Sequence, residues 1–384
     1  MRSDFELDAN VTYLNSGTQS VNPRAVTEAL DRYQREYNAN PTMGLLKAWP
    51  RVWESQLALA RFLGARAEDL FLCENVTMAL NQFTLGMPLP PGSEILYTDR
   101  EYGAIVNQCR FRAERDGLGL RQFELPGARA TTDDEVVEAL RRALGPRTSL
   151  VVVSHVISAT GHRLPIEQMA RVTRERGVLL AVDGAHGPGA FAIDFGKYDD
   201  IDFYGGNLHK WIMGPKGTGF GWVNPRHQAK LVPLGAGWPT YEKPEYFGPF
   251  GGGSRFAERF APLGCRDFAA LYAIRDAFEY WAKVTPAAIY RRLGALQDCV
   301  DREMNARVGW PRLTPDSRGP QLAYETPKGL AGQGHPLMRR LYDEHGLVVA
   351  LSPLKGGFVL RLSPHVYNTE DEIRRAADVI ARLA

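Results

Sequence analysis

Short apolar segments alternate with helical patterns through the first two thirds of this chain. The apolar segments contain no charged residue and lie at 70–72, 95–97, 150–153, 178–182 and 220–223. The clearest helical patterns between them lie at 133–144 and 165–176, where apolar residues recur at helical spacing. Strands without charges are typical of a parallel sheet that helices cover on both faces. The alternation therefore predicts an α/β fold with a mostly parallel sheet.

The pattern changes after residue 222. Residues 233–266 are rich in Gly, Pro and aromatic residues, which predicts a long loop that borders the functional site and sets its specificity. A helical pattern resumes over 267–305. Two apolar segments, 347–351 and 358–362, then precede a terminal helical pattern at 369–383.

The length of 384 residues allows two domains or one large α/β unit. The change of pattern favours two domains. We expect a large domain over 46–262 and a smaller C-terminal α/β domain over 263–384. A segment over 1–45 is expected to join the small domain.

Composition narrows the partners and the compartment. The net charge is +2 and the basic residues are scattered, which favours neither nucleic acid nor an anionic membrane surface as a partner. The sequence has no apolar stretch of about 18 residues and no signal-like region near residue 1. The cysteines form no C-x-x-C pair, which predicts reduced thiols and a cytoplasmic protein. They are Cys73, Cys109, Cys265 and Cys299.

One carboxylate and one lysine lie at positions typical of a ligand site in an α/β fold. Asp183 ends the apolar segment 178–182, and ligand sites in open α/β sheets lie beyond the carboxyl ends of strands. Lys210 follows the phrase Gly-Gly-Asn-Leu-His, interpreted as a loop. Pyridoxal phosphate requires this pair, because a lysine forms a Schiff base with its aldehyde and a carboxylate holds its ring nitrogen protonated. The alternative is a strand-capping aspartate and a surface lysine.

Further residues can complete such a site. The helical pattern that starts near Asn75 offers free N–H groups and the Thr77 hydroxyl to a phosphate, although ordinary helix capping explains the same residues. His209 can add a donor to the phosphate or be structural. Tyr102 can lie over the pyridine ring or pack in the core.

Two histidines follow strand ends at the same predicted sheet edge. His155 and His186 are placed to meet the phenolic oxygen of the cofactor. The competing interpretation is a metal cluster formed with His162 and His209. No H-E-x-x-H motif, thiolate pair or acidic ligand set accompanies these histidines, so we expect no metal.

Arg361 lies inside the apolar segment 358–362. A buried arginine needs an anionic partner, because an unpaired buried charge is costly. The carboxylate of a substrate, held by two parallel hydrogen bonds, is one such partner. A structural salt bridge is the alternative.

Taken in order, these phrases resemble the class V aminotransferase family of fold type I pyridoxal-phosphate enzymes. The branch is the one similar to isopenicillin N epimerase and related to cysteine desulfurases, selenocysteine lyases and C–S lyases. The resemblance spans nearly the whole chain and rests on seven segments. They lie at 13–18, 74–77, 101–104, 154–161, 182–186, 206–211 and 361–369.

The resemblance implies a large domain with a mainly parallel, seven-stranded sheet, and a homodimer with active sites near the interface. It implies that Lys210 is the Schiff-base lysine, Asp183 the partner of the ring nitrogen and His186 the contact of the phenolic oxygen. Arg361 would bind the substrate carboxylate. The phosphate would be held by Thr77, Asn207, His209 and the backbone at Val76.

The chain departs from the family at two positions. Desulfurases carry a nucleophilic cysteine on the loop before the carboxylate-binding arginine, whereas residues 352–357 here contain none. This puts persulfide formation in doubt. Relatives often have threonine where this chain has Cys265, and that threonine usually reaches the phosphate in the partner subunit. We expect the thiol to replace this hydroxyl.

The expected function is that of an enzyme acting on a small amino acid or amine-bearing metabolite. Lys210, once released from the cofactor, would remove the α-proton. C–S β-elimination and epimerisation are favoured outcomes, and transamination is the alternative. A non-catalytic binding subunit with this fold is a further alternative, against which the retention of both Asp183 and Lys210 argues.

Overall fold

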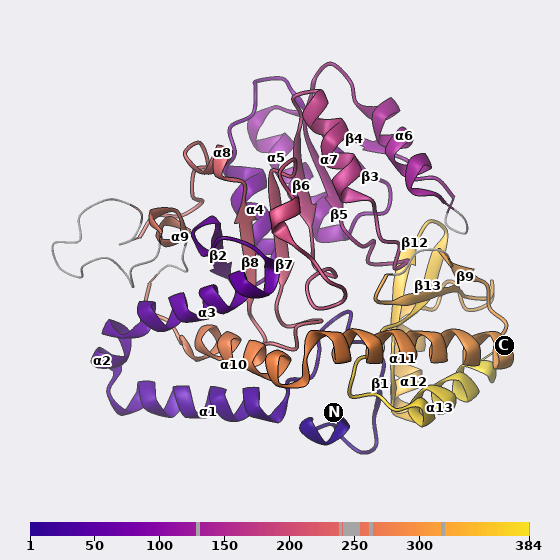
Figure 1. Cartoon of the computed structure of the whole chain (residues 1–384). Helices are drawn as coiled ribbons and strands as arrows, with labels where there is room; N and C mark the ends of the chain where they lie inside the picture. Colours follow the sequence, from indigo (N-terminus) through magenta and orange to yellow (C-terminus); the bar gives the residue numbers. More distant parts are fainter. Residues whose placement is uncertain (128–130, 238–239, 241–253, 261–263, 316–318, 384) are drawn as a thin grey trace.

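The computed structural model of the chain describes residues 1–127, 131–237, 240, 254–260, 264–315 and 319–383. It shows a large domain built on one central sheet and a smaller domain at the C-terminal end (Figure 1). Much of the predicted loop at 233–266 lies outside the described residues. Within its described part lies a short helix, α9 (Arg255–Arg259).

The central sheet has seven strands in the order β2-β8-β7-β6-β5-β3-β4. Strands β7, β6, β5, β3 and β4 pair in parallel, and β8 is antiparallel to both of its neighbours. The mostly parallel seven-stranded sheet is therefore confirmed. The strands are β2 (Leu70–Cys73), β3 (Glu94–Thr98), β4 (Gly119–Phe123), β5 (Thr148–Ser154), β6 (Leu179–Asp183), β7 (Phe203–Asn207) and β8 (Gly219–Val223).

Helices cover both faces of this sheet (Figure 1). Ala181 packs on the face that is covered by α4 (Val76–Gly86) and α5 (Gly103–Asp116). Leu180 and Val182 pack on the opposite face. That face is covered by α3 (Ala48–Leu63), α6 (Asp133–Ala143), α7 (Ile166–Glu175) and α10 (Ala269–Val284), with α1 (Arg24–Ala39) on α10. Neighbouring residues of β6 thus lie on opposite faces, as the pleat requires.

The small domain combines an antiparallel sheet with three helices. The sheet order is β12-β13-β10-β9, and β1 pairs separately with β11. These strands are β1 (Thr12–Tyr13), β9 (Arg312–Leu313), β10 (Leu322–Glu325), β11 (Leu347–Val348), β12 (Ala350–Leu354) and β13 (Gly357–Leu362). The helices are α11 (Pro286–Arg307), α12 (Gly334–His345) and α13 (Glu370–Ala381). The predicted small α/β domain is confirmed, and the domain limits at 45 and 262 stay a prediction.

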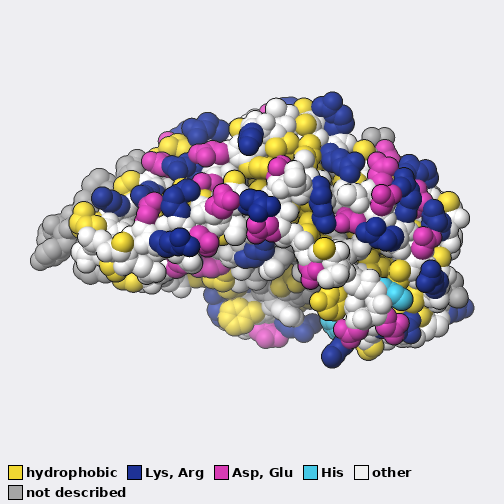
Figure 2. Space-filling view, turned by 90° about the horizontal axis from the view of Figure 1, so that it is seen from below, with side chains coloured by type: hydrophobic (Ala, Val, Ile, Leu, Met, Phe, Trp, Pro, Cys, Tyr) yellow, Lys and Arg dark blue, Asp and Glu magenta, His cyan; other side chains and the backbone are white. Residues whose placement is uncertain are grey.

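The remaining elements are short. They are α2 (Pro41–Leu46), α8 (Pro225–Gln228) and the 3-10 helices Arg2–Asp4, Ala67–Asp69 and Phe195–Lys197. No helix in the described part of the chain is long and apolar enough to cross a membrane. On the side where α1 lies, basic and acidic side chains are interspersed (Figure 2).

Strand β7 was not predicted, because its sequence Phe-Tyr-Gly-Gly-Asn contains two glycines and glycine is a weak strand former. The structure shows why glycine stands there. A Cβ atom on Gly206 would lie 2.4 Å from Cε1 of Phe220 on the neighbouring strand β8. The loop that delivers Lys210 therefore begins only after Asn207.

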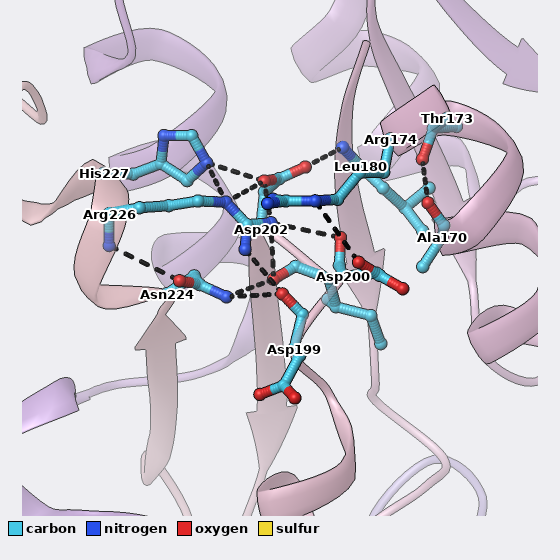
Figure 3. Close-up of polar contacts among 11 residues, drawn as sticks. Ala170, Thr173, Arg174, Leu180, Asp199, Asp200, Asp202, Asn224, Arg226 and His227 are labelled. Carbon is cyan, nitrogen blue, oxygen red and sulfur yellow. Dashed lines mark hydrogen bonds and ion pairs between the residues drawn. The ribbon is translucent and has the colours of Figure 1, made fainter. Parts of the chain in front are cut away.

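A buried ionic network joins β6, β7 and α8 at the amino end of β6 and β7 (Figure 3). One carboxylate oxygen of Asp202 accepts hydrogen bonds from Arg226 Nη2 (2.5 Å) and contacts His227 Nε2 (2.6 Å). Its other oxygen accepts from the Leu180 amide (2.7 Å). Burial acts to raise the pKa of Asp202, but these hydrogen bonds outweigh it and hold the pKa below its ordinary value.

Asp202→Asn should lower the free energy of unfolding at pH 7 by about 3 kcal/mol, because it leaves Arg226 without its buried partner. A carboxyl with a depressed folded pKa stabilises above its unfolded pKa and loses this contribution as the pH falls through the folded value. The difference between the wild type and Asp202→Asn should therefore shrink below about pH 4. Urea unfolding of both proteins at pH 7 and pH 3 measures this difference in the free energy of unfolding.

Asp200→Asn is the matched control, because Asp200 forms an ion pair with Arg174 (3.3 Å) in which both side chains are exposed. Such surface pairs contribute about 0–1 kcal/mol. Equal destabilisation by both substitutions would contradict the role given to Asp202.

Candidate active site

The candidate site lies at the carboxyl end of β6 and β7, opposite to the Asp202 network. Asp183 is the last residue of β6 and pairs in register with Gly205 of β7. Its side chain is only 4% exposed, and the Ala185 amide donates to Oδ1 at 2.8 Å. Burial raises the pKa of Asp183, while the Ala185 N–H and the charge of Lys210 oppose that rise. A bound cation would therefore favour its ionised form.

The Lys210 amine faces His186. Lys210 Nζ lies 3.3 Å from His186 Nε2, and no carboxylate lies within 4.0 Å of it among the described residues. Burial, reinforced by the charge of Arg361 and partly opposed by Asp183, lowers the pKa of Lys210 to about 8. About a tenth of the amine is therefore neutral, and hence nucleophilic, at pH 7, far more than for an ordinary lysine.

Arg361, on β13, is buried at 4% exposure and makes four hydrogen bonds to neutral oxygens. Nη1 donates to the carbonyl and hydroxyl of Ser158 (both 3.0 Å), and Nη2 donates to Asn15 Oδ1 (3.2 Å) and Thr18 Oγ1 (3.1 Å). Nε has no partner, and no acidic side chain of the described residues comes within 4.0 Å of the guanidinium. The structural salt bridge is therefore absent from the described part of the chain.

Burial lowers the pKa of Arg361 to about 10, which leaves it charged at neutral pH. A buried cation held only by neutral groups is suited to an anion from outside the chain. Asn15, Thr18 and Ser158, which hold it, were not identified as site residues from the sequence. The segments 13–18 and 154–161 carry them, but the sequence gives no sign that both meet β13.

The start of α4 has a different hydrogen-bond pattern from the one expected. The Val76 amide donates to Asn207 Oδ1 (2.9 Å), and the Met78 amide donates to Asn75 Oδ1 (3.0 Å). The Thr77 amide and hydroxyl have no hydrogen-bond partner among the described residues. The Asn207 side-chain oxygen thus satisfies the Val76 amide, whereas the Thr77 donors stay open among the described residues.

His209 contacts the backbone just before β8. Its Nδ1 lies 3.1 Å from the Thr218 carbonyl, and burial lowers its pKa to about 4. The ring is therefore neutral at pH 7, with Nδ1 donating to the carbonyl. Its predicted contact with a phosphate stays a prediction.

His155 does not lie with the other predicted site residues. Its Nδ1 lies 2.9 Å from the Tyr204 hydroxyl, and its ring packs edge-on against Phe191 at 5.0 Å. Tyr204 pairs in register with Val182, on the sheet face opposite to Asp183. This geometry argues against the predicted contact with the cofactor, because strand side chains alternate between faces and His155 follows Ser154 by one residue.

Tyr102 precedes α5 and is 54% exposed, so the core-packing alternative is wrong. It lies near enough to Arg361 to oppose the lowering of the guanidinium pKa by burial. The neighbouring Glu101 is a buried acid that the sequence analysis missed. It accepts hydrogen bonds from Ser154 and Thr98, and burial, to which Asp183 adds, raises its pKa to about 7. Stacking of Tyr102 on a cofactor ring stays a prediction.

Cys265 is exposed, whereas Cys73, Cys109 and Cys299 are buried. The next residue, Arg266, donates to Glu74 at 2.9 Å and so holds this segment near the start of α4.

The hairpin between β12 and β13 is held by Lys355, whose amine contacts Asp99 (2.9 Å) and Glu124 (3.0 Å). No group of three or more potential metal ligands gathers within the described residues.

The side chains present fit pyridoxal phosphate. The site offers a lysine amine with a depressed pKa, a buried carboxylate with a single hydrogen bond from the described residues, and open donors at a helix start. These are the groups that can bond the aldehyde, the ring nitrogen and the phosphate.

Comparison with known proteins gives the same family. A family model described as aminotransferase class-V matches residues 12–326. The isopenicillin N epimerase of Streptomyces clavuligerus is 35% identical over 392 residues, covering 100% of this chain and 97% of that protein. A probable cysteine desulfurase of Vibrio cholerae is 25% identical over 387 residues, covering 95% of this chain and 91% of that protein.

A solved structure shares the fold. The cystine C–S lyase C-DES, in complex with its reaction product cysteine persulfide, matches with a TM-score of 0.86 at 23% identity, covering 97% of this chain and 98% of that chain. The family match over most of the sequence, together with 35% identity along the whole chain, shows that the protein belongs to the class V aminotransferase family of pyridoxal-phosphate enzymes.

Proposed function

We propose that the protein removes the Cα proton of a small amino acid or amine-bearing metabolite and that the outcome is epimerisation or C–S β-elimination. The observation that carries this proposal is that the Arg361 guanidinium and the Lys210 amine belong to the same site. The buried Arg361 guanidinium, for which the described residues supply no acidic partner, is near enough to the Lys210 amine to lower its pKa. An α-amino acid needs both groups, one for its carboxylate and one for the proton on Cα.

When bound, pyridoxal phosphate supplies an aldehyde that reacts with amines and a pyridinium ring that withdraws electrons from the bonds at Cα. The carboxylate of Asp183 would hold the ring nitrogen protonated. Thr77 would donate to the phosphate, and His186 would face the phenolic oxygen. Lys210 would accept the Cα proton, for which a pKa of about 8 is well matched at neutral pH.

Sequence similarity favours epimerisation as the first outcome to test. The relative with 35% identity is an isopenicillin N epimerase. Relatives named cysteine desulfurase favour chemistry at a sulfur-bearing substrate, which keeps C–S elimination as the second candidate. Residues 352–357 contain no cysteine, and the buried Cys109 has its pKa raised to about 12 by burial. Neither observation supports a thiolate nucleophile.

A substrate panel tests the proposal. The enzyme, loaded with pyridoxal phosphate, is incubated in D₂O with L- and D-amino acids and cysteine conjugates. Deuterium at Cα with inverted product indicates epimerisation, whereas pyruvate with sulfide or a thiol indicates elimination. Keto acid without ammonia would indicate the alternative, an aminotransferase. A protein that binds no pyridoxal phosphate would contradict the proposal and favour a non-catalytic binding subunit.

The pKa of Lys210 gives a pH-dependent prediction. The Lys210 amine of the apoprotein should be methylated by formaldehyde and a reductant with a midpoint near pH 8, because it is charged and unreactive below that pH and neutral above it. An ordinary lysine should have a midpoint near ~10.4. Peptide mass spectrometry across pH 6–11 measures both. A midpoint above pH 10 for Lys210 would contradict the depressed pKa.

The assembly and the compartment are also proposals. The family resemblance supports a homodimer, and the absence of paired cysteines supports a reducing compartment such as the cytoplasm. Size measurement of the holoenzyme in solution tests the first of these.

A further inference from the structure

The imidazole of His186 contacts two different groups through its two nitrogens. The indole N–H of Trp211 donates to His186 Nδ1 at 3.3 Å, and His186 Nε2 lies 3.3 Å from Lys210 Nζ. An indole nitrogen can only donate, so Nδ1 must carry a lone pair. Burial and the charges of Lys210 and Arg361 hold the pKa of His186 well below its ordinary value, so the ring is neutral. Its single proton therefore resides on Nε2.

Trp211 is itself fixed by the small domain. Its side chain is fully buried, and the ring of His365 stacks on it with centroids 5.6 Å apart and planes 19° apart. The Val366 amide donates to His365 Nδ1 (2.8 Å), which places the His365 proton on Nε2, 3.1 Å from the Trp211 carbonyl. Tyr367 continues the stack at 5.4 Å. The stacked rings of His365 and Tyr367 thus hold the indole in one orientation.

We propose that Trp211 is a positioning residue that fixes His186 in the Nε2–H tautomer, so that His186 presents an N–H to the Lys210 amine. No other hydrogen-bond partner of Lys210 Nζ is present among the described residues. A neutral amine accepts this N–H, whereas an ammonium ion cannot. The contact therefore favours neutral Lys210, the form that bonds an aldehyde or accepts a proton.

Other charged and titratable groups act on Lys210 only at longer range. Asp183 on β6 favours the ammonium form, and Arg361 on β13 disfavours it. His209, adjacent in the chain, is neutral. The charges of Asp183 and Arg361 act on Lys210 equally for either His186 tautomer. An effect of the tautomer on the Lys210 pKa can therefore be distinguished from theirs.

The Trp211→Phe variant tests this assignment. Phenylalanine keeps a ring against His365 but has no N–H, so the Nδ1–H tautomer becomes accessible and Nε2 can accept from the ammonium. The Lys210 methylation midpoint of the apoprotein should rise by roughly 0.5–1 pH unit, about a 3- to 10-fold change in the ratio of charged to neutral amine. Trp281→Phe is the matched control. It also removes a buried indole N–H, but one that donates to the Ile212 carbonyl (2.9 Å), and it should leave the midpoint unchanged.

A second measurement reads the tautomer directly in the wild-type apoprotein. In apoprotein labelled with ¹⁵N-histidine, the His186 resonance, assigned through its loss in His186→Gln, should show a protonated Nε2 and an unprotonated Nδ1 at pH 7. In Trp211→Phe the Nδ1–H form should gain population. The wild-type tautomer tests the proposal even if a tryptophan variant folds poorly.

An Nδ1–H tautomer in the wild-type apoprotein would overturn the proposal, as would an unchanged Lys210 midpoint in folded Trp211→Phe. The catalytic meaning of the contact rests on the proposed function of Lys210. Both measurements use apoprotein, so their failure is distinguishable from failure of the substrate panel.

Discussion

Lys210→Ala should remain folded and still bind pyridoxal phosphate, but its turnover should fall by at least about 10³-fold. The loss of a positioned general base alone removes roughly 10²–10⁴-fold in rate. The variant also lacks the amine that bonds the aldehyde. Borohydride treatment followed by mass spectrometry should attach the cofactor to the Lys210 peptide in the wild type and attach none in the variant. Cofactor release on dialysis should become faster.

Lys216→Ala is the matched control for this experiment. Lys216 follows in the same part of the chain, and its amine donates to Asn22 Oδ1 at 2.6 Å. No contact joins it to His186 in the described structure. We expect activity within a few-fold of the wild type. Substantial turnover in Lys210→Ala, or cofactor attached at Lys216, would refute the assignment of Lys210.

Arg361→Ala should lower kcat/KM for substrates with an α-carboxylate by roughly 10²–10³-fold, because truncating one partner of a buried charge pair costs about 2–5 kcal/mol. Amines without a carboxylate should be affected far less, because they do not use this contact. Initial rates for an amino acid and for the corresponding decarboxylated amine measure the difference. Equal losses for both substrates would contradict a carboxylate site.

Arg112 provides the contrast. It is also a buried arginine, with hydrogen bonds to the Thr84 and Met87 carbonyls, but it has an acidic partner in Asp116 at 2.6 Å. Arg112→Ala should therefore lower stability without changing the preference for carboxylate substrates. If it changed that preference as strongly as Arg361→Ala, the effect would have to come from general loosening of the fold.

Local patterns in the sequence identified most of the large sheet. Charge-free segments became β2, β3, β5, β6 and β8, because strands buried on both faces need apolar side chains throughout. Strands β4 and β7 were not identified by this criterion. Strand β4 contains Arg121 and Gln122 at the edge of the sheet, and β7 contains two glycines, of which Gly206 is required by the Phe220 ring.

The site was predicted less completely than the sheet. Lys210 contacts His186 and is influenced by Asp183 and Arg361, while the roles of these four residues stay predictions. His155 lies on the other face of the sheet, because one residue along a strand reverses the direction of the side chain. Asn207 bonds the Val76 amide that was expected to serve a phosphate. The groups that hold Arg361 come from residues 15, 18 and 158, far from it in the chain.

The sequence by itself determined the α/β alternation, the position of Asp183 at a strand end and the family, because these follow from periodicity and from contiguous motifs. Only the tertiary structure decided which face each polar side chain takes, which amide at the start of α4 stays open, and that Trp211 bonds His186 while stacked on His365. Trp211 and His365 are 154 positions apart in the chain, and besides the ring stack His365 Nε2 contacts the Trp211 carbonyl. No local pattern encodes it, because it forms only when the small domain packs against the segment that carries Lys210.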